Sequence, residues 1–252
     1  MKILALDSSG IVASVAVVED DTLLAEYTVN YKKTHSQTLL PMLDEVVKMT
    51  ELDLGTIDAI AVAAGPGSFT GLRIGSATAK GLGLALDKPL VAVPTVEALA
   101  YNLYDVKGLV CPIMDARRSQ VYTGIYRFEK HALTVVEDQM AVPVTELLER
   151  LNELGEKKSG EKELGEKEPV VSVTFLGDGV PVFRDVIART LKIPYSFAPA
   201  HVNKQRAAAV ASLGMVYYKE GRIENARDHN PEYLRVSQAE RERAEREAGK
   251  RS

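Results

Sequence analysis

Two short segments contain the residue types that handle phosphate groups. Asp7-Ser8-Ser9 follows the apolar stretch Lys2 to Leu6, and Asp115-Ala116-Arg117 follows the apolar stretch Leu109 to Met114. A carboxylate in such a turn can hold a magnesium ion or orient a water molecule, while hydroxyl and backbone N–H groups contact phosphate oxygens. Aspartate and serine also form ordinary turns, which is the structural alternative. The matched pair favours a relict nucleotide cleft, with Asp7, Ser8, Ser9, Asp115 and Arg117 as candidate contacts.

The histidines and the cysteine do not form a recognisable metal site. His35, His131, His201 and His229 never occur in the His-x-x-x-His spacing that places two ligands on one helical face. Cys111 is the single cysteine, which excludes an intramolecular disulfide and a cysteine-based zinc site. Because Cys111 lies in an apolar stretch, we expect it to be a buried core residue. The sequence therefore predicts no metal site.

Small residues recur at intervals of four in a long predicted helix. Gly65-Pro66-Gly67 changes the chain direction after the apolar stretch 57–64, and the chain then continues to Leu86 without another proline. Each helical glycine costs roughly 1 kcal/mol relative to alanine, so something must approach the helix closely. The small residues that form this ridge are Gly67, Gly71, Gly75, Ala79 and Gly83.

Three explanations of the ridge stay open. Its close neighbour is another element of the same chain, a helix of a partner protein, or an anion bound by free N–H groups at the turn 65–70. A Walker-type loop does not fit, because its terminal Gly-Lys-Ser/Thr is replaced here by Gly71-Leu72-Arg73.

The predicted helix from His35 to Met49 has an unusually wide apolar face. Its apolar side chains spread over about half of the helix circumference at 100° per residue. Half of that arc can cover the helix's own sheet, and the other half then needs a partner. The sequence thus predicts a protein interface on this helix and on the neighbouring ridge helix.

The order of predicted elements occurs twice along the chain. Each pass reads three strands, helix, strand, helix, strand, helix, with a boundary near residues 104–108. We expect an N-terminal lobe at 1–104 and a C-terminal lobe at 105–236, with a charged exposed loop at 155–168 and a charged tail at 237–252. With the two hairpins, this order predicts an α/β fold of two actin-like lobes (ASKHA, ribonuclease H-like), each a mixed sheet with helices.

Composition bounds the class of protein. The chain has 252 residues, 46% of them hydrophobic, and a formal net charge of −4. No apolar run reaches the roughly 20 residues of a membrane span, so a cytoplasmic protein without membrane contact is expected. Nucleic-acid binding by the chain alone is not expected, because phosphate contacts need clustered Lys and Arg. A role on nucleic acid would need a partner.

Five segments together resemble the bacterial TsaB (YeaZ) family. The similarity runs from Met1 to about Arg235, and the glycine segment is its most specific part. The segments are residues 1–9, 35–41 (HSQTLLP), 65–75 (GPGSFTGLRIG), 114–118 with Val121-Tyr122, and 231–235 (PEYLR).

The resemblance implies a non-catalytic scaffold subunit of the machinery that makes N6-threonylcarbamoyladenosine in tRNA. It implies a TsaD-like paralogue and a TsaE-like ATPase as partners, tRNA contact only through the complex, and a homodimer when the chain is alone. A cofactor is not required, although weak ATP or ADP binding with magnesium is compatible with the fold. The implied interface residues are His35, Leu39, Leu40, Leu43, Val47, Phe69, Gly71, Leu72, Gly75 and Ala79.

Two enzyme functions are the alternatives. An ATP-dependent sugar or acyl kinase of the same superfold would use Asp7 and Asp115, but the sequence offers no recognisable catalytic base. A glycoprotease-type metallopeptidase would need ligand histidines at metal-binding spacing. We therefore expect no intrinsic activity.

Overall fold

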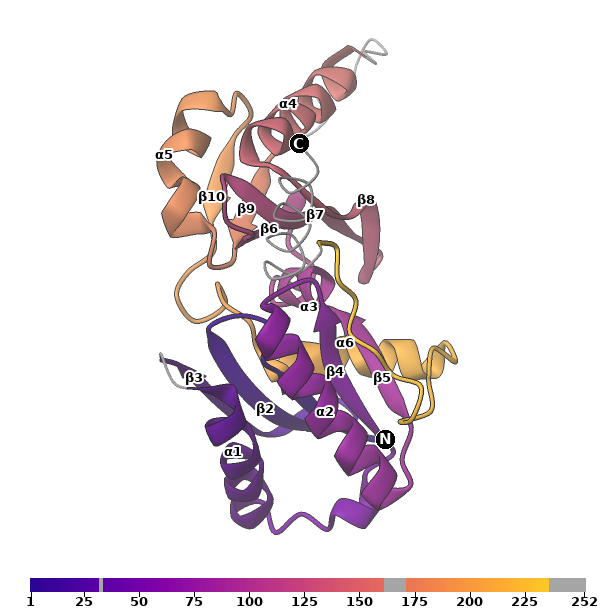
Figure 1. Ribbon diagram of the computed structural model, residues 1–252. Helices are drawn as coiled ribbons and strands as arrows, with labels where there is room; N and C mark the ends of the chain where they lie inside the picture. The colour runs from indigo at the N-terminus through magenta and orange to yellow at the C-terminus, as the bar shows by residue number, and fades with distance from the viewer. Residues whose placement is uncertain (32–33, 161–170, 236–252) are drawn as a thin grey trace, which may run out of the picture.

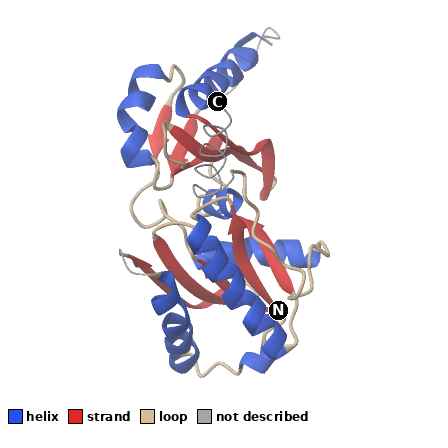
Figure 2. Cartoon of the chain, viewed as in Figure 1, coloured by secondary structure: helices blue, strands red, loops and turns tan. Residues whose placement is uncertain are grey.

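The computed structural model describes residues 1–31, 34–160 and 171–235, which form two five-stranded sheets with helices (Figure 1, Figure 2). The strands are β1 (Lys2–Asp7), β2 (Val12–Glu19), β3 (Thr22–Asn30), β4 (Ala59–Gly65), β5 (Leu90–Pro94), β6 (Leu109–Asp115), β7 (Gln120–Glu129), β8 (Ala132–Pro143), β9 (Val173–Leu176) and β10 (Tyr195–Phe197). The helices are α1 (His35–Met49), α2 (Phe69–Leu86), α3 (Thr95–Tyr101), α4 (Val144–Gly160), α5 (Val180–Thr190) and α6 (Ala207–Lys219), with a short 3-10 helix η1 (Leu54–Thr56).

The two sheets have the same topology. The first has the order β3-β2-β1-β4-β5, and the second, β10-β9-β6-β7-β8, is the same order read from the other edge. In each sheet three antiparallel strands are followed by two parallel ones, for example Ile3 opposite Ala59 between β1 and β4. The central strands β1 and β4 are almost wholly apolar because helices cover both of their faces. The predicted two-lobe actin-like fold is confirmed.

Helices cover the first sheet on both faces. Leu39, Leu43 and Val46 of α1 pack on one face together with Ala79 of α2. On the other face, α6 packs across β1, β2, β4 and β5, with Val210 and Leu213 in the core. The second sheet carries α4 and α5 on one face. Its other face packs against α3, which joins the two lobes at their centre (Figure 1).

One element lies in a different lobe from the one that the sequence predicted. The order of elements assigned α6 to the C-terminal lobe, but this helix covers the first sheet. Its first two N–H groups are bonded there: Ala207 donates to Ser14 Oγ at 2.9 Å, and Ala208 donates to Glu26 Oε1 at 3.0 Å. These bonds satisfy N–H groups that a helix start leaves free. The boundary near residue 105 otherwise stays a prediction.

The predicted charged loop begins too early. Residues 155–160 continue α4 as helix, where Gly155 packs so closely on Ile193 that a Cβ atom would collide with it. The remainder of that loop and the tail at 237–252 lie outside the described residues. Among the described helices, none is both long and apolar enough to cross a membrane. Cys111 is buried as predicted, and burial raises the pKa of its thiol to about 12.

Candidate interlobe cleft and partner surface

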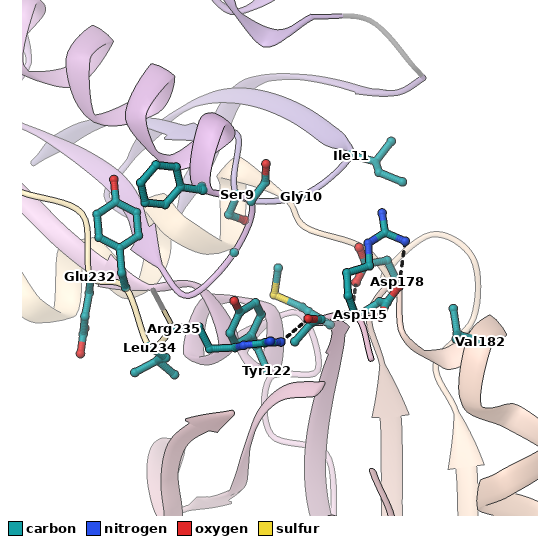
Figure 3. A pocket seen from close by; sticks show the side chains of 17 residues that line it. Ser9, Gly10, Ile11, Asp115, Tyr122, Asp178, Val182, Glu232, Leu234 and Arg235 are labelled. Carbon is teal, nitrogen blue, oxygen red and sulfur yellow. Dashed lines mark hydrogen bonds and ion pairs between the residues drawn. The ribbon is translucent and has the colours of Figure 1, made fainter. Parts of the chain in front are cut away.

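A cleft of about 570 Å³ lies between the lobes where the two hairpins face each other. Figure 3 shows its walls: Ser9 and Gly10 come from the β1–β2 hairpin, Asp115 and Tyr122 from the second lobe, and residues 232–235 from the C-terminal segment. Asp178, after β9, also lines it. The two aspartates that end β1 and β6 are topologically equivalent, as predicted. Of these two aspartates, Asp115 lines the cleft and Asp7 does not.

Asp7 and Ser8 are turned away from the cleft. The Asp7 side chain is buried, and its Oδ1 accepts hydrogen bonds from the Ser9 N–H at 2.9 Å and the Ser9 hydroxyl at 2.6 Å. Ser8 donates its hydroxyl to the Gly71 carbonyl at 2.9 Å. The predicted nucleotide and magnesium contacts of these two residues therefore do not fit the structure, because their side chains already serve the hairpin's own geometry.

Ser9, Asp115 and Arg117 do line the cleft. Asp115 accepts the Arg117 N–H at 2.8 Å, and its other oxygen is 3.3 Å from the Arg117 guanidinium. The Asp115 N–H in turn donates to Asp178 Oδ1 at 3.2 Å, and burial raises the pKa of Asp178. Nucleotide binding by Ser9, Asp115 and Arg117 stays a prediction.

The hairpin tip that carries Arg117 has an uncommon backbone. Arg117, Arg118 and Ser119 have φ values of 64°, 56° and 57°, in the left-handed region that non-glycine residues rarely adopt. The Asp115 carboxylate and the bond from the Gln120 N–H to the Arg117 carbonyl, at 3.1 Å, hold this turn. Of the three residues, Arg117 lines the cleft, and its side chain is 86% exposed.

Burial raises the pKa of Asp7 to about 6, against the opposing effects of the Ser9 hydrogen bonds and of His35. The folded chain thus binds a proton on Asp7 more tightly than the unfolded chain, whose value is 3.8. The resulting stabilisation is complete below pH 3.8 and is lost as the pH rises through 6. We expect Asp7→Asn to be more stable than the wild type by about 2–3 kcal/mol at pH 7.5 and nearly equal at pH 4.

Urea unfolding at pH 4, 6 and 7.5 measures this difference. Ser9→Ala is the matched control, because it removes a donor to the ionised carboxylate and should lose stability mainly above pH 6. An Asp7→Asn protein that is less stable than the wild type by the same amount at every pH would contradict the assignment.

The glycine ridge packs against other parts of the same chain, and its first three glycines meet the first hairpin. A Cβ atom on Gly71 would lie within 3.0 Å of the Ser8 carbonyl oxygen, and one on Gly75 would lie 2.5 Å from Ser8 Oγ. Gly67 meets Ser9 in the same way. Of the three explanations for the ridge, close packing within the same chain is therefore correct. Gly81 also belongs to α2 but lies outside the ridge, and a Cβ atom placed on it would meet no atom within 4 Å.

Comparison with curated proteins identifies the family. A protein from Bacillus subtilis (strain 168) named tRNA threonylcarbamoyladenosine biosynthesis protein TsaB is 34% identical over 240 residues, which is 95% of this chain and 96% of that protein. The chain belongs to the TsaB family. A TsaB protein of Escherichia coli (strain K12) is likewise 34% identical, over 61% of this chain and 68% of its own length.

The broader relationship is to TsaD. Residues 22–243 match the family model described as TsaD, tRNA N6-adenosine threonylcarbamoyltransferase. Among solved structures, YeaZ from Pseudomonas aeruginosa superimposes with a TM-score of 0.73 at 25% identity, covering 92% of this chain and 99% of that one. A second structure, an uncharacterized Pseudomonas aeruginosa protein with similarity to peptidase YEAZ, has a TM-score of 0.74 at 24% identity over 93% and 99% of the two chains. This second match concerns the fold alone.

Several interface residues predicted from the TsaB resemblance are buried inside this chain. Their side chains or Cα atoms pack on the first sheet or on the first hairpin, so they have no free surface for a partner. These residues are Leu39, Leu43, Gly71, Leu72, Gly75 and Ala79. Leu40 is 53% exposed, while His35, Val47 and Phe69 are half-buried. The His35 ring donates through Nε2 to the Gly10 carbonyl at 2.8 Å, so it supports the hairpin.

The side of α1 and α2 that points away from the sheet exposes apolar and small residues among polar ones, such as the Asp44–Lys48 ion pair. We call it the outer helix face, and its exposed apolar and small residues, together with Arg73, are Leu40, Met49, Ala77, Gly81, Leu84 and Ala85. Leu84 is 52% exposed, and the small residues Ala77, Gly81 and Ala85 lie at intervals of four. Part of the predicted α1 arc thus covers the sheet, and a partner interface on its exposed residues Leu40 and Met49 stays a prediction. The exposed small residues of α2 lie on a different side of that helix from the predicted ridge.

Sequence reasoning missed part of the cleft lining. Tyr122, Asp178 and residues 232–235 line it, although none was predicted as a site residue. The signals were present: Val121-Tyr122 and the 231–235 segment belong to the TsaB resemblance, and Asp178 stands between two glycines after a strand. Within the described residues, no group of three or more His, Cys, Asp or Glu side chains gathers to hold a metal ion.

Proposed function

We propose that this chain is a non-catalytic subunit of the complex that forms N6-threonylcarbamoyladenosine in tRNA. Its role is to support threonylcarbamoyl transfer by a TsaD-type partner. Membership of the TsaB family supports the pathway, because the relatives are named for the biosynthesis of this nucleoside. The outer helix face is the observation that supports a partner-binding role.

The outer helix face fits a helical partner. Exposed Leu40 on α1 and Leu84 on α2 offer apolar side chains for burial, and the exposed small residues of α2 allow a second helix to approach closely. The TsaD-type partner is itself related to this chain through the same family model. In the absence of that partner, a second copy of the chain covers the same face and forms a homodimer. A TsaE-type ATPase and the tRNA join through the complex, in the cytoplasm.

The arrangement of the cleft supports a non-catalytic role. Asp7, the carboxylate that a kinase of this fold would aim at phosphate, is buried against Ser9. Residues 232–235 occupy one wall of the cleft, where they narrow the space for a substrate. Both observations disfavour the kinase alternative.

Reconstitution tests the proposal. The chain is combined with TsaD-type and TsaE-type proteins, the enzyme that supplies threonylcarbamoyl-adenylate, and unmodified tRNA, and the nucleosides are analysed by mass spectrometry. We expect threonylcarbamoyladenosine only when this chain and the TsaD-type protein are both present. Product formed at the same rate without this chain would refute the subunit role, and turnover by the chain alone that Asp115→Asn abolishes would favour the kinase.

A further inference from the structure

The chain returns to the second lobe after its last helix. Residues 225–235, here called the strap, leave the edge of the first sheet, run beside α2 and reach β8, where Glu232 contacts Gln139 (Figure 1). The strap belongs to the segment that lines the cleft, but its contacts extend well beyond the cleft wall.

The middle of the strap is fixed to the first lobe. Lys80 on α2 donates to the His229 carbonyl at 2.8 Å, and the Glu232 N–H donates to the Ala64 carbonyl at 2.7 Å. The Glu232 carbonyl lies against Gly65, so closely that no Cβ atom fits there. Gly65 also has a φ of +128°, which side chains disfavour. The fold therefore reserves a position at the end of β4 for the strap.

The end of the strap is bonded to the second lobe. The Arg235 guanidinium donates to the Ala116 carbonyl in the β6–β7 hairpin (Figure 3). The Glu232 carboxylate accepts a hydrogen bond from Gln139 Nε2 on β8 at 2.8 Å. These bonds lie at or near the surface, where polar contacts form and break readily. The strap thus has a firm anchor on one lobe and releasable bonds to the other.

Tyr233 connects the strap with the outer helix face. Its ring lies 4.6 Å from the ring of Phe69, centroid to centroid, and its hydroxyl accepts from Arg73 Nε at 3.3 Å. The Arg73 guanidinium also stacks over Phe69 at 4.0 Å. Because Arg73 is exposed on α2, a partner that covers the outer helix face meets the same guanidinium that holds Tyr233.

We propose that the strap is a latch: it ties the two lobes together across the mouth of the cleft, and partner docking on α2 loosens it through Arg73. The coupling to docking rests on the proposed function, whereas the latch itself belongs to the isolated chain. A partner that draws Arg73 into its own contacts removes the donor from Tyr233 and favours release of Arg235 from the second lobe. By linkage, release of the latch must then raise the affinity for the partner.

Hydrogen–deuterium exchange on the isolated full chain tests the latch. Arg235→Ala removes the bond to Ala116, and Gln139→Ala breaks the second attachment without altering the strap. We expect peptides that cover the two hairpin tips, residues 8–11 and 115–120, to exchange about tenfold faster in both variants, with β4 unchanged. Arg227→Ala, an exposed strap position, is the matched control and should exchange like the wild type. Unchanged hairpin protection in both folded variants would overturn the latch.

Titration with a TsaD-type protein tests the coupling. We expect the Arg235→Ala chain to bind the partner about three- to tenfold more tightly than the wild type and the Arg227→Ala control. Equal affinities would overturn the coupling. Failure of the wild type to bind any TsaD-type protein would instead count against the proposed function, while the exchange experiment still decides the latch.

Discussion

Gly71→Ala is expected to lower the free energy of unfolding by about 2 kcal/mol or more, whereas Gly81→Ala should raise it by up to about 1 kcal/mol. Both glycines lie in α2, where alanine has the higher helix propensity. At Gly71 the new methyl group must displace the Ser8 carbonyl, which is backbone and cannot rotate away. At Gly81 it meets nothing within 4 Å. Opposite signs from the same Gly→Ala substitution would thus distinguish the buried and exposed sides of α2.

Thermal and urea unfolding of the two variants measure this contrast. For a chain of this size, 2 kcal/mol corresponds to a fall in Tm of about 4–8 °C. A gain of stability at both positions would mean that α2 does not press on the first hairpin at Gly71, and a loss at both would mean that the space beside Gly81 is not open. Gly75→Ala provides a further check, because its neighbour is the Ser8 hydroxyl, a side-chain group that can adjust. We therefore expect a smaller loss there than at Gly71.

Leu40→Glu and Leu84→Glu should each weaken binding of a TsaD-type partner about 30-fold or more, which is about 2 kcal/mol. The reason is that a charge at the centre of an apolar interface loses its water without gaining a partner. Because both leucines are about half exposed in the isolated chain, the fold should tolerate the change with little loss of stability. Titration calorimetry with circular dichroism of the same samples measures both quantities.

Val135→Glu is the matched control for these two variants. Val135 is 47% exposed, on β8 of the second sheet, and does not belong to the outer helix face. It should bind the partner with wild-type affinity. Partner binding that is unaffected by Leu40→Glu and Leu84→Glu would place the interface elsewhere, and loss of binding by Val135→Glu as well would indicate a surface on the second lobe.

The order of elements and the pairing of Asp7 with Asp115 could be predicted from the sequence because both follow from local patterns. Each aspartate ends an apolar strand, and the doubled order of strands and helices determines the topology. The direction of a side chain after such a strand depends on what lies beyond the turn. For Asp7 that neighbour is Ser9, and nothing in the spacing distinguishes a carboxylate that faces a cleft from one that bonds its own hairpin.

The glycine ridge shows a similar limit. Intervals of four predicted that some backbone lies against α2, and the prediction was right about closeness. The spacing could not identify the neighbour, because the contact is long-range: Ser8 is 63 residues away from Gly71 in the sequence. The placement of α6 is long-range in the same sense. Its N-terminus bonds to Ser14, a pairing across 193 residues that no local pattern encodes.

The placement of α6 determines the order in which the two lobes can be completed during synthesis. A ribosome delivers β1 to β5 first, yet the helix that covers one face of their sheet is delivered only after the entire second lobe. Until then Ile3, Ala61 and Val91 leave an apolar face uncovered on the nascent chain, where it is prone to aggregate. A fragment that stops near residue 104 would share the same exposure permanently. The lobe that is translated first is therefore completed last. A C-terminal truncation that removes α6 uncovers the N-terminal lobe while it leaves the strands and helices of the second lobe in place.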